Sequence, residues 1–185
     1  MKKIISFSFI TALLVFGVSC KKEEAAKLTE FDINYSTNLT IPSVSMTVSN
    51  PSLTPTTVEF TTPNVPTQQA AKFSAEGTAQ SLIDQIKMTK FDISVSGSGA
   101  NLDFLKSLTV YIKASGLGEQ IVATKTNIPS GITSVAMELQ DLNIKDYIFK
   151  DNIQFRVVAI FDETAATDQV LKMDETVHVK ATLLK

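Results

Sequence analysis

The chain has 185 residues, 17 basic and 19 acidic side chains, and a formal net charge of −2. Arg156 is its one arginine and the lysines are scattered, which argues against a nucleic-acid partner because phosphate backbones require clustered positive charge. Cys20 is the one cysteine, so no intrachain disulfide can form and stability must come from a hydrophobic core, which a chain of this length can bury.

The N-terminal residues have the organisation of an export signal. Lys2 and Lys3 precede an uncharged run over residues 4–18, and small residues lead up to Cys20. A transmembrane helix needs roughly 20 apolar residues, so this run is too short to span comfortably and instead has the length of a signal-peptide apolar region. We therefore expect export from the cytoplasm.

The four residues Gly17-Val18-Ser19-Cys20 resemble the lipobox of bacterial lipoproteins. Ser19 fits that pattern, whereas Gly17 stands where a leucine is usual. The resemblance implies that residues 1–19 are removed, that Cys20 becomes the first residue and carries lipid on its sulfur, and that this lipid anchors the chain to a membrane. The alternative is an ordinary secretory signal, which would leave Cys20 as a reactive thiol.

Four charged residues, Lys21, Lys22, Glu23 and Glu24, follow the cysteine directly. They resemble the short acidic tag of Bacteroidetes-type lipoproteins, which is associated with export to the outer face of the outer membrane. The resemblance implies an outer-membrane lipoprotein that faces the cell exterior, with the periplasmic face as the alternative. On physical grounds alone, residues 20–29 are a charged, solvated tether.

Residues 30–185 are expected to form one domain, whose first half contains short strands. Apolar residues alternate over 31–41 and again over 44–48, which predicts strands with one buried and one exposed face. Five of the six prolines lie within residues 42–66, so strands there should be short, at sheet edges or broken by turns. Further along, the pattern predicts a short strand over 70–73 and one or two helical turns over 78–86.

The second half has a more regular strand pattern. Glycine-containing turns separate predicted strands at 88–96, 108–112, 120–124 and 135–139, with a helical turn at 101–106. Residues 141–149 have helical spacing, with Asp141 as the expected N-cap. The clearest strands are 153–161 and 171–183, the second interrupted by Glu175, and residues 162–169 are predicted to be a hairpin loop between them.

These elements together predict an all-β fold. About eight or nine strands with short connections, and no strand-helix-strand rhythm, favour an antiparallel two-sheet sandwich, Ig-like or jelly-roll-like, with one to three short helical turns. A single barrel is the alternative that the pattern supports less well.

His178 is the only histidine, so any histidine-dependent site must use it. Its strand parity places it with Thr176 and Lys180 on the exposed face of the last strand, and the chain contains no G-x-S-x-G motif. We predict an ordinary exposed histidine, no catalytic residue and no cofactor.

Acidic residues near the predicted 162–169 loop give two further hypotheses. Asp162, Glu163 and Asp168 are candidate calcium ligands, although they lack the spacing of a calcium loop, and a solvated loop is the prediction that we prefer. Together with Asp174 and Glu175, they could also supply the two carboxylates of a glycoside hydrolase.

Tyr111 is the one tyrosine expected to point outward, and it is the candidate ligand contact. Sugar-binding surfaces use flat aromatic rings, but the chain has no tryptophan and offers a single outward ring, so a tyrosine that merely covers its neighbours is the alternative.

The functional hypothesis is a non-catalytic, outer-membrane-anchored surface lipoprotein that presents its sandwich as a binding or scaffolding domain. Its expected partners are the membrane, through Cys20, and other surface proteins or glycans. The alternatives are a glycan-binding subunit of a surface complex and a carboxylate-based hydrolase.

Overall fold

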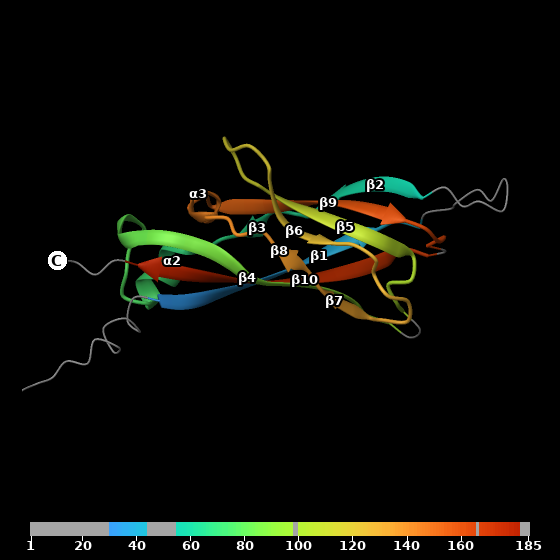
Figure 1. The fold of residues 1–185 in the computed structure, drawn as a ribbon. Coiled ribbons are helices and arrows are strands. Elements are labelled where there is room, and N and C mark those ends of the chain that lie inside the picture. The colour runs from blue at the N-terminus through green and yellow to red at the C-terminus, as the bar shows by residue number, and fades with distance from the viewer. Residues whose placement is uncertain (1–29, 44–54, 98–99, 166, 182–185) are drawn as a thin grey trace, which may run out of the picture.

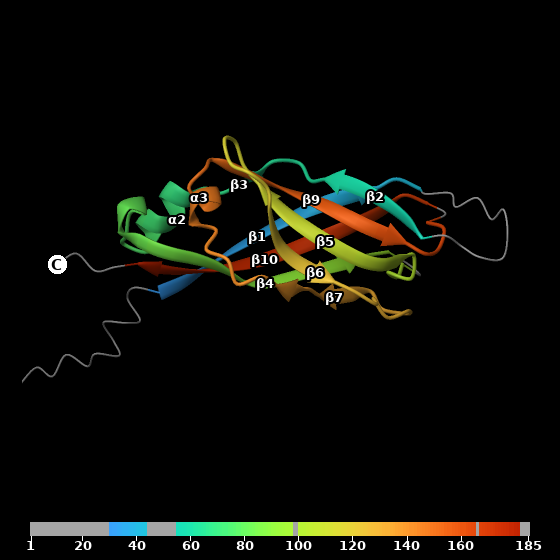
Figure 2. The same ribbon diagram turned by 45° about the horizontal axis from the view of Figure 1, so that its top comes forward.

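The computed structural model describes residues 30–43, 55–97, 100–165 and 167–181. Within these ranges the chain forms two antiparallel sheets that stack as layers (Figures 1 and 2). The predicted strand at 44–48 and the residues of the predicted signal and tag lie outside the described ranges.

The first sheet has four strands in the order β1-β10-β4-β7. They are β1 (Glu30–Ile41), β4 (Ile83–Val95), β7 (Ser134–Ala136) and β10 (Gln169–Ala181). Strands β1 and β10 pair along their full length, from Glu30 opposite Lys180 to Ile41 opposite Gln169. The longest strands of the molecule therefore form one layer.

The second sheet has six strands, with β2-β9-β5-β6-β8 as its main order and β3 pairing with β9 as well. They are β2 (Thr56–Thr61), β3 (Val65–Pro66), β5 (Leu105–Lys113), β6 (Gln120–Lys125), β8 (Glu138–Leu139) and β9 (Asn152–Phe161). In the described residues of the proline-rich part, the chain forms the edge strand β2 and the two-residue strand β3, as predicted. The predicted all-β, two-sheet sandwich is confirmed.

Inward-facing side chains of the two sheets fill one core. Alternation is strict in β9, where Ile153, Phe155 and Val157 are buried and the residues between them are partly exposed. Phe91 of β4 and Phe155 of β9 meet edge to face across the layers, with ring centroids 5.4 Å apart. This burial of apolar surface is the main stabilising contribution in a chain without disulfides.

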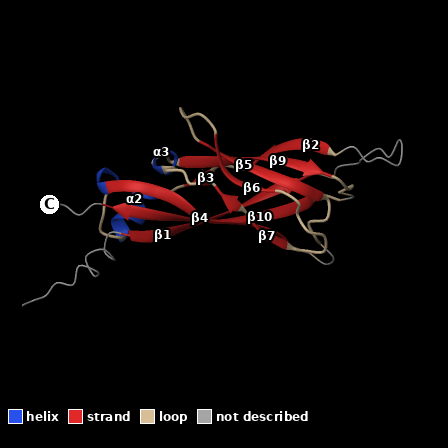
Figure 3. Ribbon diagram, in the orientation of Figure 1, coloured by secondary structure: helices blue, strands red, loops and turns tan. Residues whose placement is uncertain are grey.

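The helical segments lie near one end of the sandwich, beside the start of β1 and the end of β10 (Figure 3). They are α2 (Gln69–Ala75), a 3-10 turn (Gln80–Leu82) and α3 (Lys145–Ile148). The strand predicted over 70–73 is wrong, because this alanine-bearing segment forms α2 and buries only Phe73, against Phe31 and Phe149. The predicted helical turns over 78–86 are correct only for the 3-10 turn, since β4 already begins at Ile83.

The predicted strand over 135–139 is two strands in two different sheets. Strand β7 pairs with β4, β8 pairs with β6, and the chain crosses between the sheets at Met137. The backbone N–H of Met137 still donates to Phe91 O at 2.9 Å, while that of Gln140 donates to Val122 O at 2.9 Å. Alternation alone does not reveal this crossing, because the side-chain parity continues through it.

The predicted hairpin over 162–169 is also wrong. Strand β9 belongs to the six-stranded sheet and β10 to the four-stranded sheet, so residues 162–168 connect the two layers instead of two paired neighbours. The alternation of apolar residues predicts both strands correctly, but it does not show which strands they pair with.

Asp141 is not the N-cap of α3, contrary to the prediction. The helix begins after Ile144, and Asp141 instead pairs with Lys87 of β4. Asn143 links the segment before α3 to β4. Its Oδ1 accepts hydrogen bonds from the backbone N–H of Ile86 at 3.1 Å and of Lys145 at 3.3 Å.

We expect Thr62→Val to lower the free energy of unfolding by about 1–3 kcal/mol, because it leaves a buried donor without its acceptor. Thr62 is 2% exposed, and its Oγ1 accepts from the backbone N–H of Phe155 at 2.9 Å. Urea unfolding measures the effect, with Thr57→Val on the exposed face of β2 as the matched control. Equal stabilities of the two variants would show that the Thr62 hydroxyl contributes nothing.

Candidate functional site

His178 lies on the outer face of the four-stranded sheet, as its parity predicted. Its Nδ1 is 2.7 Å from Asp32 Oδ1 and its Nε2 is 3.5 Å from Glu30 Oε2, both on the neighbouring strand β1. Lys180 Nζ is 3.2 Å from Glu30 Oε1 and, by its hydrogen bond and charge, lowers the pKa of Glu30. Both ring nitrogens of His178 therefore face carboxylates of β1.

Sequence reasoning found His178 but missed its two carboxylate partners. The parity of the sequence could have suggested them, because Asp32 lies on the first predicted strand and Glu30 precedes it with the same parity. Only the pairing of β1 with β10, which places Asp32 directly opposite His178, brings them together. The group is a partly exposed charge network on the outer face of the sheet, and such pairs contribute little to stability.

Tyr111 lies on the outer face of the six-stranded sheet, as predicted, between the buried Val110 and Ile112. The guanidinium carbon of Arg156 lies 4.0 Å from the ring centroid. Arg156 is in turn held by Glu119, with Nη2 to Oε2 at 2.7 Å, and this contact lowers the pKa of Glu119. One face of the candidate ring is thus covered by a cation that is itself fixed in place.

The acidic residues near the 162–168 connection do not form a common site. Asp168 Oδ1 accepts from the backbone N–H of Ser43 at 2.8 Å, which ties it to the chain after β1. In the described ranges there is no group of three or more histidine, cysteine or acidic side chains that could hold a metal ion. Asp162, Glu163 and Asp168 are therefore close in sequence without being arranged as a calcium site.

Asp174 and Glu175 point to opposite faces of the sheet, so they do not converge as a catalytic pair. Asp174 is on the outer face and pairs with Lys172, Oδ2 to Nζ at 2.7 Å, which lowers its pKa. Glu175 faces the core, is 2% exposed, and has two carboxyl oxygens without a hydrogen-bond partner in any other described residue. Burial raises the pKa of Glu175 to about 8, with a smaller contribution from the charge of Asp174.

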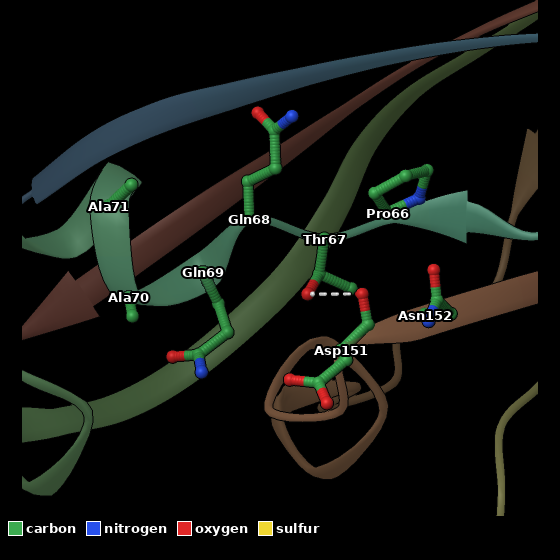
Figure 4. Close-up of a pocket in the computed structure, with 8 residues that line it drawn as sticks. All are labelled: Pro66, Thr67, Gln68, Gln69, Ala70, Ala71, Asp151 and Asn152. Atoms are coloured by element: carbon green, nitrogen blue, oxygen red, sulfur yellow. Dashed lines mark hydrogen bonds between the residues drawn. The ribbon is translucent and has the colours of Figure 1, made fainter.

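A shallow pocket of about 490 Å³ lies between the segment preceding α2 and the start of β9 (Figure 4). Thr67 lines the pocket, and its Oγ1 donates to the carbonyl of Lys150 at 2.5 Å and lies 3.3 Å from that of Asp151. Gln68, whose φ of 50° is in the left-handed region, and Gln69 extend their amides in opposite directions in Figure 4. The polar groups around this pocket therefore do not converge on one ligand position.

Across the described ranges, no helix is long and apolar enough to cross a membrane. The geometry defines the protein class as an all-β, antiparallel two-sheet sandwich. A scan against models of known protein families finds no match, and neither does a search of curated proteins.

Proposed function

We propose that this protein is a lipoprotein of the outer membrane that presents its β-sandwich on the cell exterior as a non-catalytic binding or scaffolding domain. The observation that carries the proposal is the run from Gly17 to Glu24, in which a lipobox-like sequence is followed at once by a charged tag. Lipid on Cys20 would hold the chain to the membrane.

The beginning of the domain supports this arrangement. Strand β1 starts at Glu30, ten positions after Cys20, and a tether of that length reaches at most about 35 Å. The start of β1 and the end of β10 lie at one end of the sandwich, while the 162–168 connection lies at the other (Figure 1). An anchored domain would therefore turn the 162–168 end away from the membrane.

The geometry gives less support to the alternative functions. A glycan-binding surface would need an accessible aromatic face, and Arg156 lies over that of Tyr111. A hydrolase would need two carboxylates converging in a cleft, whereas Asp174 and Glu175 occupy opposite faces of the sheet. A binding or scaffolding role requires neither arrangement.

Protease treatment of intact cells tests the surface assignment. We expect external proteinase K to digest the wild-type protein, while a variant with Lys22, Glu23 and Glu24 changed to alanine stays protected until the outer membrane is opened. Lys27→Ala, outside the tag, is the matched control and should behave as wild type. Protection of the wild-type protein on intact cells would overturn the exterior location.

A further inference from the structure

The carboxyl group of Glu175 lies inside the core, where its ionisation could change the conformation of the sheet. Most buried acids are paired or accept several hydrogen bonds, because an unpartnered charge in the interior is very costly. Glu175 has no partner of this kind in the described residues. Its cross-strand neighbours are Tyr35 of β1 and Phe91 of β4, so it sits in the middle of the four-stranded sheet, on the inner face.

The strand most easily displaced from Glu175 is β1. It is the outermost strand of its sheet and pairs only with β10 in the described structure, whereas β4 is held on both sides, by β10 and β7. Beyond Tyr35 lies α2, whose Lys72 places Nζ 3.7 Å from the centroid of the tyrosine ring. Water could therefore reach the carboxyl group from the β1 side with the least disruption of the sandwich.

Tyr35 fastens β1 to the rest of the molecule. Its hydroxyl donates to the carbonyl of Thr67 at 3.2 Å, and Thr67 in turn donates from its backbone N–H to Asp151 O at 2.9 Å. The charge of Glu175 contributes to raising the pKa of Tyr35, although burial is the larger cause. The two side chains are thus close enough to influence one another, directly across the β1–β10 pairing.

A β-bulge next to Glu175 supplies a second, independent observation. Thr176 is opposite Lys90 but Val177 is opposite Met88, so Thr89 is an extra residue in β4 at this point. The Thr89 hydroxyl donates to the carbonyl of Thr176 at 3.3 Å. Bulges interrupt the ladder and increase local twist, so the β10–β4 pairing is irregular next to Glu175, as it is again between Lys180 and Ala181.

We propose that Glu175 is a proton-controlled latch for β1: its neutral carboxyl group permits β1 to stay docked, and its ionisation releases the strand and admits water. The titratable or charged side chains around it are Tyr35 from β1, Lys72 from α2 behind that ring, and Asp174 from its own strand; the neighbour on β4 is Phe91. A pKa near 8 places the change slightly above neutral pH. The inference is independent of the lipid anchor.

Hydrogen exchange of the domain at pH 6 and pH 9, expressed as protection factors, tests the latch. In the wild-type protein, we expect β1 amides to lose about tenfold or more protection at pH 9 beyond the loss shown by β9 amides, which follows the global stability of the domain. Glu175→Gln, which cannot ionise, should keep β1 protected at both pH values. Glu59→Gln, an exposed acid on β2, is the matched control and should retain the wild-type response.

Tyr35→Phe is a second variant, which separates the contribution of the Tyr35–Thr67 hydrogen bond from that of Glu175 ionisation. It should lower β1 protection at both pH values, because the bond to Thr67 is lost, while keeping the fall between pH 6 and 9. The latch would be overturned by an equal fall in Glu175→Gln, by no fall in the wild type, or by a loss in β1 no larger than the loss in β9.

Discussion

Replacing Glu175 with glutamine is expected to remove most of the pH dependence of folding stability between pH 5 and pH 8. In the folded state, burial raises the pKa of Glu175 from 4.5 to about 8, while the unfolded chain keeps the ordinary value. Between pH 4.5 and pH 8, the carboxyl group of Glu175 is ionised in the unfolded chain but stays protonated in the folded domain. Stability is therefore fully present below pH 4.5 and falls as the pH rises toward 8, by roughly 3 kcal/mol in total between pH 5 and pH 8.

Urea unfolding of both proteins at half-unit pH intervals measures this difference. The exposed acids with lowered pKa values, such as Glu30 and Asp174, lose their protons below this window and therefore contribute a constant term in both proteins. Glu59→Gln, an exposed acid on β2 that does not contribute to the pKa of Glu175, is the matched control and should keep the wild-type slope. Parallel curves for wild type and Glu175→Gln would show that the buried carboxyl group does not control stability.

Replacing Cys20 with alanine is expected to release the protein from membranes completely. We propose no attachment to the membrane other than the lipid on Cys20, and the described residues include no helix that could span a membrane. Fractionation of cells expressing the variant should move the protein from the membrane pellet to the soluble fraction, with incorporation of labelled palmitate lost.

Ser19→Ala is the matched control for this experiment, since it keeps a small residue before Cys20 and should leave anchoring intact. Membrane retention of Cys20→Ala at the wild-type level would contradict the anchor and favour an ordinary secretory signal or another means of attachment.

The fold class could be predicted because the local pattern and the final burial agree for most strands. Strand β9 alternates without exception, and β1 follows its predicted range within one residue. The predictions were wrong where one local pattern is compatible with two different strand pairings. Alternation continues through Met137 although the chain changes sheets there, and residues 162–168 separate two clear strands that pair with other partners.

The contacts of the candidate residues were harder to predict because they depend on which strands pair. Asp32 and His178 are far apart in the sequence and meet only through the β1–β10 register. Tyr111 was correctly placed on an outer face, but the guanidinium of Arg156 over its ring follows from the β5–β9 register. Glu175 interrupted an apolar alternation, which is the pattern that a buried acid leaves in a sequence.

The most direct test of the anchored-lipoprotein proposal is the mass of the intact protein purified from membranes of cells that process lipoproteins. The proposal predicts a chain that begins at Cys20 and whose mass exceeds that of residues 20–185 by the mass of its attached lipid. A chain that begins elsewhere, or that begins at Cys20 with an unmodified thiol, would contradict the proposal.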